Sequence, residues 1–112
     1  MSKKNPANLN PLQLKTLTLF QALAKMDGAK TGESEGSIRI DRLPHAHGDH
    51  FHMGPYVVLG KDATGLHNEA VWVALERKGF IKSLFPIAVE VTKTGLEYET
   101  GLANELLHSS GH

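Results

Sequence analysis

Five residues between His45 and His52 are of types that bind transition metals: His45, His47, Asp49, His50 and His52. Imidazole and carboxylate groups suit zinc, nickel, iron or manganese. In an extended segment, side chains two positions apart project to the same side. His45 with His47, or His50 with His52, would then share one ion, and Asp49 would bind it or orient an imidazole. The stretch suggests a divalent metal such as zinc as a cofactor. The alternative, which we favour for the stretch alone, is a polar loop whose histidines bond locally or titrate near neutral pH.

The string from His45 to His50 also resembles the His-x-His-x-Asp-His signature of the metallo-β-lactamase fold. The resemblance implies one zinc held at the positions of His45 and His47 and another at those of Asp49 and His50, with water activated for hydrolysis. That fold is about twice as long as this chain, and its later ligands have no counterpart in a matching context here. We therefore interpret the string as incidental.

Other catalytic chemistries have little support in the sequence. The chain contains no cysteine, which excludes disulfides, thiolate metal sites and cysteine nucleophiles. Ser37 and Ser83 lack a nucleophile-elbow context, and the segment from Gly60 to Gly65 lacks the spacing of a phosphate-binding loop. We expect no enzyme, unless the histidine cluster supports catalysis.

Length and composition predict a single globular domain, residues 1–112, with 40% apolar and 21% charged residues. Twelve basic residues balance twelve acidic ones, so any nucleic-acid binding must depend on a local patch. The most apolar run, Leu17 to Ala24, is too short to span a bilayer, and Met1 to Leu9 does not resemble a signal peptide. We therefore expect no membrane association and a cytoplasmic location.

The first half of the chain predicts one helix and two strands. Asn10 is a good N-cap for a helix from Pro11 to Met26 with a broad apolar face. Strands are expected from Ser37 to Leu43 and from Tyr56 to Leu59. Residues 1–9, 29–36 and 108–112 are expected to be flexible or frayed.

The second half predicts a helix, a hairpin and a helix. Asn68 begins a helix from Glu69 to Lys78, which Gly79 ends. The expected strands are Phe80–Leu84 and Ile87–Thr92, around a Phe85-Pro86 turn. Thr94 and Glu97 have capping-box spacing, which favours a last helix from Thr94 to Leu107.

This order resembles the winged-helix regulators of the MarR-like kind, most clearly over residues 66–107. The resemblance lies in the stretch from Val71 to Ile81, where a helix closes on a leucine, a charged pair and a glycine, and in Val91 to Leu96. It implies an α+β, winged-helix-like fold with three main helices, a small antiparallel sheet and a short wing near Ser83 to Pro86. The chain departs from the family in one respect. The family has its second helix just before the recognition helix, but the corresponding segment here, from His45 to Gly65, shows no helical periodicity of apolar residues.

The resemblance implies nucleic-acid binding or transcriptional regulation, with double-stranded DNA as partner. Seven residues would contact it: His67, Asn68 and Trp72 on the helix start, and Arg77, Lys78, Lys82 and Lys93 on phosphates. Each has a structural alternative: Asn68 as a cap, Trp72 as a core or interface residue, and the cations as a solvated rim. A winged-helix module that binds proteins instead of DNA is a second interpretation, and a histidine-dependent metal-binding protein is a third.

Dimerisation is also left open by the sequence. MarR-like regulators dimerise through terminal helices, and the apolar faces of Leu12–Met26 and Leu96–Leu107 would serve such a homodimer. The same faces would equally fill the core of a monomer.

Overall fold

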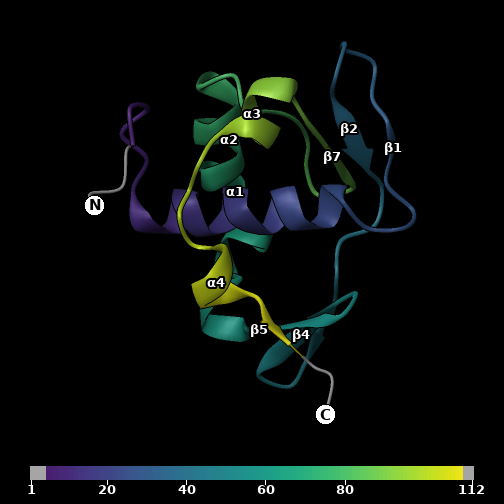
Figure 1. The fold of residues 1–112 in the computed structure, drawn as a ribbon, viewed down its shortest axis with the longest axis vertical. Coiled ribbons are helices and arrows are strands. Elements are labelled where there is room, and N and C mark those ends of the chain that lie inside the picture. The colour runs from purple at the N-terminus through teal and green to yellow at the C-terminus, as the bar shows by residue number, and fades with distance from the viewer. Residues whose placement is uncertain (1–4, 110–112) are drawn as a thin grey trace.

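A long helix, α1 (Pro11–Ala24), crosses the middle of the molecule, with one sheet above it and a second below it (Figure 1). The structure is a computed structural model that describes residues 5–109, except for the side chain of His47. Residues 1–4 and 110–112, for which the sequence predicts fraying, lie outside this described range. The fold is α+β with small antiparallel sheets, as the sequence predicts.

The start of α1 is fixed by a reciprocal cap. Asn10 Oδ1 accepts a hydrogen bond from Gln13 N at 2.8 Å, and Gln13 Oε1 accepts one from Asn10 N at 3.0 Å. The helix ends two residues earlier than predicted, at Ala24. Leu17, Leu19 and Phe20 are fully buried. The apolar face of α1 therefore fills the core of the single chain. The sequence had left open whether this face fills a monomer core or forms a dimer interface.

Residues 5–9, which we expected to be frayed, pack onto the fold. Leu9 is buried, and Asn5 Oδ1 accepts hydrogen bonds from Leu9 N and from the Tyr98 hydroxyl group. Burial of Leu9 and these two bonds fix the chain just before α1.

The first sheet has the strand order β1-β2-β7-β6 and is antiparallel throughout. Its strands are β1 (Lys30–Thr31), β2 (Ile38–Ile40), β6 (Ile81–Leu84) and β7 (Ala88–Val91). All four residues of β7 are buried, because this strand pairs on both edges and packs near α1. The segment 29–36, expected to be a mobile loop, contributes β1 to this sheet.

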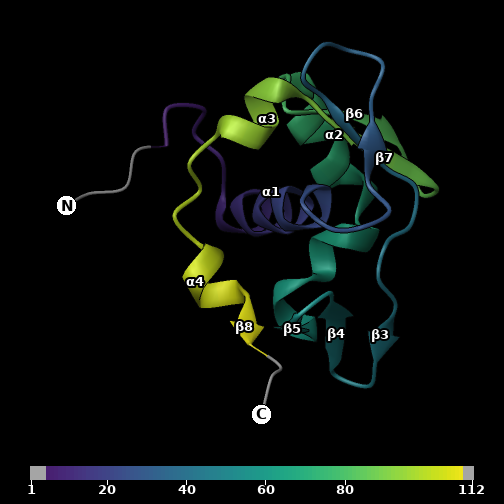
Figure 2. The same ribbon diagram turned by 45° about the vertical axis from the view of Figure 1, so that its right-hand side comes forward.

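The second sheet has the order β3-β4-β5-β8 and lies at the other end of the molecule (Figure 2). It comprises β3 (Ala46–His47), β4 (His50–Met53), β5 (Tyr56–Leu59) and β8 (His108–Ser109). Only β5 was predicted from the sequence, with the observed bounds. The short strand β8 brings the end of the described chain against β5.

A short connection leads from the second sheet to helix α2 (Glu69–Arg77). It consists of two 3₁₀ turns, η1 (Gly60–Asp62) and η2 (Thr64–His67). They occupy the place in the chain where the winged-helix resemblance would put its second helix. Asn68 caps α2 by accepting from Ala70 N at 3.1 Å, and Gly79, with φ of +82°, reverses the chain into β6.

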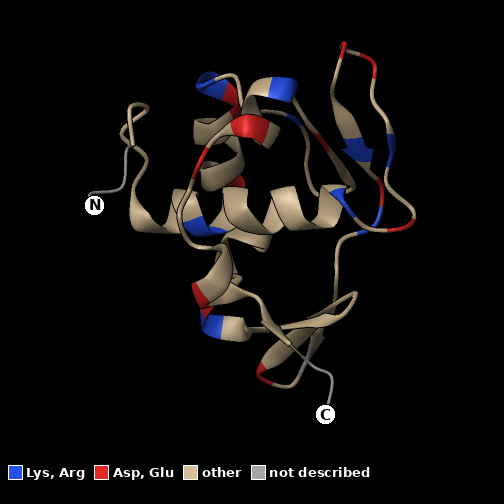
Figure 3. Cartoon of the chain, in the orientation of Figure 1, with Lys and Arg blue, Asp and Glu red and all other residues tan. Residues whose placement is uncertain are grey.

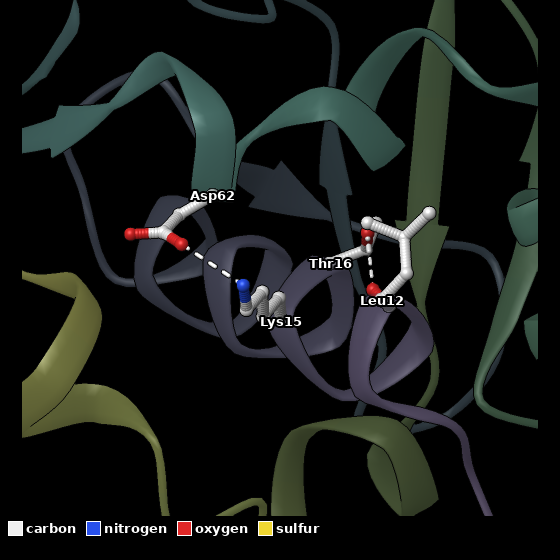
Figure 4. Close-up of polar contacts among 4 residues, drawn as sticks. All are labelled: Leu12, Lys15, Thr16 and Asp62. Atoms are coloured by element: carbon white, nitrogen blue, oxygen red, sulfur yellow. Dashed lines mark hydrogen bonds and ion pairs between the residues drawn. The ribbon is translucent and has the colours of Figure 1, made fainter.

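An ion pair, shown in Figure 4, and one close packing contact hold this connection against α1. Lys15 Nζ lies 3.0 Å from Asp62 Oδ1, and the carboxylate is largely buried. The Thr16 hydroxyl group donates to Leu12 O within the helix at 2.8 Å. Gly65 packs so closely on Thr16 that a Cβ at Gly65 would lie 3.1 Å from Thr16 Cβ and overlap the hydroxyl oxygen. This close approach positions α2, which begins four residues later, at Glu69.

The predicted helix from Thr94 to Leu107 is wrong. The chain forms two short helices, α3 (Lys93–Glu97) and α4 (Ala103–Leu106), with Gly101 between them at φ +74°. The cap is Thr92 and not Thr94, because Thr92 Oγ1 accepts from Gly95 N at 3.0 Å. Gln21 of α1 then donates to Gly95 O and Tyr98 O, at 2.8 and 2.7 Å. These bonds satisfy carbonyl groups that a continuous helix would have used itself.

No helix in the described range 5–109 is long and apolar enough to cross a bilayer.

A buried carboxylate fastens the β1–β2 loop to the first sheet. Glu90 of β7 is 3% exposed, and its Oε2 accepts from Ser37 Oγ at 2.6 Å and from Ser34 N at 3.1 Å. The bond from Ser37 is the main cause that lowers the pKa of Glu90. Burial opposes it, while backbone bonds in the loop and the charge of Lys82 add to it.

We expect Glu90→Gln to lower the free energy of unfolding by about 1–3 kcal/mol at neutral pH, because the ionised acceptor is lost. Since the folded pKa lies below the unfolded value, this stability is present above about pH 4.5 and is lost as the pH falls through the folded pKa. Urea unfolding of the wild type and the variant from pH 7 to pH 3 measures the difference. Glu97→Gln, at an exposed position, is the control. If the loss of unfolding free energy in Glu90→Gln were as large at pH 3 as at pH 7, it would contradict a stabilising role of the ionised Glu90.

Candidate binding surfaces

The histidine cluster lies on the β3–β4 hairpin of the second sheet. The backbone of His47 pairs with that of His50, and the turn between them contains Gly48, with φ of +67°, and Asp49. A glycine adopts this conformation without strain, so the sequence Gly-Asp suits a tight turn between two strands. His50 and His52 therefore stand two positions apart on β4 and face the same side.

His50 and His52 are in direct contact. Their Nε2 atoms are 3.2 Å apart, and their rings are nearly perpendicular, with centroids 4.9 Å apart. On the other side of the first ring, His50 Nδ1 lies 3.3 Å from Asp49 Oδ1. The structure thus brings together three of the five residues of the cluster, as a carboxylate, an imidazole and a second imidazole in series.

The other two residues of the cluster are placed differently or not described. His45 is exposed and lines a cleft of about 450 Å³ together with His67, Pro86 and Ile87. The side chain of His47 lies outside the described part of the structure. Among the side chains that are described, no group of three or more histidine, aspartate or glutamate residues is arranged to hold a metal ion.

Trp72 does not lie on the surface, which corrects its place among the DNA-contacting residues. It is 0% exposed, and its Nε1 donates to Gly65 O at 3.1 Å. The rings of Phe20 and Phe85 approach it edge-on, with centroids at 5.1 and 5.0 Å. Trp72 therefore joins α1, α2 and the hairpin in one core.

Residues 67–70, at the start of α2, are exposed, but His67 and Asn68 make contacts within the fold. Asn68 uses its side-chain oxygen for the cap. His67 is exposed, and its ring lies against Phe51, with centroids 6.2 Å apart. Both side chains remain accessible to a partner at this end of the helix.

The predicted phosphate contacts, Arg77, Lys78, Lys82 and Lys93, are all exposed. They lie near the end of α2 and the base of the hairpin. His67 and Asn68 lie at the other end, about 13 Å away along the helix. Figure 3 shows acidic segments, in red, close to basic ones, in blue, at this end of the molecule.

Several of these charged side chains also make local contacts. Lys78 Nζ donates to Ala7 O at 2.7 Å, and the aliphatic part of Lys93 lies beside Gly36. Lys82 stands directly opposite Glu90 in the sheet. The cations are thus accessible, but they form no patch of one sign.

An exposed apolar surface was missed by the sequence reasoning. Ile87 is 75% exposed, Leu84 43% and Val73 38%. The first two flank the Phe85-Pro86 turn at the hairpin tip, and Val73 follows Trp72 on α2. Because Phe85 packs on Trp72, the tip lies against α2. The signal was present in the sequence, since no charged residue occurs from Ser83 to Val89.

Comparisons with protein-family models, with curated proteins and with solved structures find no match to this chain.

Proposed function

We propose that this chain is a self-associating interaction module of the winged-helix kind, which docks through an apolar ridge formed by Val73, Leu84 and Ile87. The observation that carries the proposal is the exposure of Ile87 and Leu84 at an uncharged hairpin tip. The proposal takes up the protein-interaction alternative that the sequence left open.

The order of the elements supports the winged-helix part of this proposal. Helix α1 leads through β1 into β2, helix α2 precedes the β6–β7 hairpin, and β7 pairs with β2 in one antiparallel sheet. The hairpin projects beside α2 as a wing would. The 3₁₀ turns η1 and η2 in place of a second helix weigh against reading of the DNA major groove, which needs a complete helix-turn-helix.

The character of the ridge supports docking to protein. It holds three of the four large hydrophobic side chains that are exposed within residues 5–109, the fourth being Leu59 on β5. Burying Ile87 would contribute on the order of 1–2 kcal/mol. The residues from Ser83 to Ile87 carry no charge, so the tip itself adds no desolvation penalty. Asp41 and Arg42 line the same cleft as Ile87, so a contact that covered this cleft would have to desolvate them. A wing that binds phosphate, by contrast, would carry cations at its tip.

A second copy of this chain is the partner that we propose, because its charges do not oppose such a contact. The formal net charge is zero, so two copies do not repel one another. A twofold contact would bring one ridge against the other, with Glu76 and Arg77 of α2 available at its rim. An interface centred on three side chains implies a weak dimer, with Kd on the order of 0.1–1 mM.

Sedimentation equilibrium over a concentration series tests the proposal. We expect the wild type to show concentration-dependent association and Ile87→Ser to weaken it by roughly tenfold or more. Leu59→Ser is the matched control, because it removes an equally large exposed side chain from the other sheet. A wild type that stays monomeric at the highest concentration, or equal effects of the two variants, would overturn the proposal.

Nucleic-acid binding is the second candidate function, and the four exposed cations near the hairpin base favour it. If they contact phosphates, a gel shift with random duplex should weaken steeply with salt, with a slope of about −0.9 for each phosphate contact. The double variant Lys78→Ala/Lys93→Ala should then have a less steep salt dependence. Lys25→Ala, at the C-terminal end of α1, should leave the salt dependence unchanged. Absence of a shift at low salt would remove this candidate.

A further inference from the structure

We propose that His50 and His52 form a two-imidazole binding site for one divalent transition-metal ion, with Asp49 orienting the first imidazole. This site is independent of the ridge: it lies on the second sheet, whereas the ridge belongs to α2 and the first sheet. It also differs from the zinc pairs that the metallo-β-lactamase resemblance implies, because His52 lies outside that motif.

The distance between the two ring nitrogens carries the inference. Two imidazole nitrogens that each bind a tetrahedral ion at about 2.0–2.1 Å lie about 3.3–3.4 Å apart. The Nε2 atoms of His50 and His52 are 3.2 Å apart. An ion therefore needs almost no change in their separation. With His50 Nε2 as the acceptor of the present bond, His52 must move its proton from Nε2 to Nδ1 when the ion binds, so that both Nε2 lone pairs face the ion.

Asp49 favours the tautomer of His50 that binds metals. With the carboxylate ionised, the Nδ1–H group of His50 donates to Asp49 Oδ1, across 3.3 Å. The lone pair is then on Nε2, the atom that faces His52. A carboxylate that accepts from the far nitrogen of a ligating histidine is a recurrent feature of metal sites, where it orients the ring and raises its basicity. Asp49 is a positioning residue in this arrangement and does not touch the ion.

The backbone makes the pair rigid. His50 and His52 belong to β4, which pairs with β5 over four residues, and the intervening Phe51 is buried in the core. Strand geometry therefore holds the two side chains on one face. His52 also borders a cleft of about 520 Å³ between the end of α1 and β4, which leaves the ion's remaining positions accessible to water.

The chemistry of the donors selects the metal. Two neutral imidazoles suit zinc, nickel or copper(II), and the order of affinities for a nitrogen site places copper(II) above nickel and zinc. Magnesium and calcium prefer oxygen ligands and should not bind. With two protein ligands, we expect one ion per chain and a lower affinity than that of structural zinc sites with four ligands.

Calorimetric titration of the untagged full chain with zinc, nickel and copper(II) salts tests this site. We expect one equivalent of each metal to bind, with affinity reduced at least tenfold by His50→Asn and by His52→Asn. The control is His67→Ala, which should bind as the wild type does. The His67 ring lies against Phe51, and strand alternation places Phe51 on the opposite face of β4 from His50 and His52. Asp49→Asn should weaken binding roughly tenfold without changing the stoichiometry.

NMR correlations of the histidine ring nitrogens provide a readout that identifies the atoms. Zinc should shift the Nε2 resonances of His50 and His52 and leave that of His67 unchanged. Circular dichroism of each variant checks that it is folded. No binding by the folded wild type, or binding that survives in both His50→Asn and His52→Asn, would overturn the proposal. Neither result would bear on self-association through the ridge.

Discussion

Replacing Trp72 with alanine is expected to lower the free energy of unfolding by about 3–5 kcal/mol, the range for large aromatic side chains in a core. Trp72 is fully buried between Phe20 and Phe85, and its indole N–H group bonds to Gly65 O. The variant would leave a cavity where α1, α2 and the hairpin meet, and Gly65 O would keep only its bond from Asn68 N. Urea unfolding followed by circular dichroism measures the effect.

The adjacent Val73→Ala is the control for this prediction. Val73 is 38% exposed, so we expect its loss to cost less than about 1 kcal/mol. Because Trp72 is the only tryptophan, its fluorescence gives a second check: the native emission should resist quenching by acrylamide and shift to longer wavelength on unfolding. If acrylamide readily quenched the tryptophan fluorescence of the native protein, and Trp72→Ala changed the unfolding free energy little, the indole would be exposed. Trp72 would then again be a candidate DNA contact.

Replacing Gly95 with alanine should also be strongly destabilising, by about 3 kcal/mol or more, because the added methyl group has no room. A Cβ at Gly95 would overlap the carbonyl oxygen of Phe80 and lie 2.9 Å from its carbonyl carbon. That carbonyl group already accepts from Thr92 N, so relieving the clash would separate α3 from the start of the hairpin.

The sign of this effect makes it a sharp test. Glycine to alanine within an unobstructed helix stabilises a protein, by up to about 1 kcal/mol. Thr94→Ala, at the exposed preceding position of the same helix, controls for helix propensity and should change the unfolding free energy little. Thermal and urea unfolding of both variants measure the difference. A Gly95→Ala protein as stable as the wild type would mean that α3 does not pack on Phe80 as described.

The parts of the fold that the sequence predicted well depend on local signals. Asn10 and Asn68 act as helix caps, and Gly79 ends α2, where the sequence placed them. The alternation from Ile87 to Thr92 indicated a strand, and β7 forms within it. Caps, turns and alternation arise from neighbouring residues, so they can be identified without the tertiary structure.

The errors arise where distant residues decide the structure. Apolar spacing from Leu96 to Leu106 favoured one helix, but Gln21 of α1 bonds to the carbonyl groups of Gly95 and Tyr98 and the chain turns away. Trp72 was assigned to the surface from its position on a recognition-like helix. Its burial follows from Phe20, more than 50 residues away in the chain, which no local pattern reveals.

The candidate sites were predictable to different degrees. Alternation placed His50 and His52 on one side, and the structure brings them into contact. His45 precedes β3 and lines a different cleft, which spacing alone did not show. The exposure of Ile87 was not anticipated, because alternation placed it in the predicted strand Ile87–Thr92, on the same face as Val89 and Val91. In the structure the strand begins at Ala88, and Ile87 belongs to the turn.

Methyl NMR of the wild type over a dilution series would test the proposed function most directly, since it locates the interface as well as detecting it. We predict that the methyl resonances of Ile87, Leu84 and Val73 move together with concentration, while those of Leu59 remain unchanged. Shifts confined to other methyl groups, or none at any concentration, would contradict it.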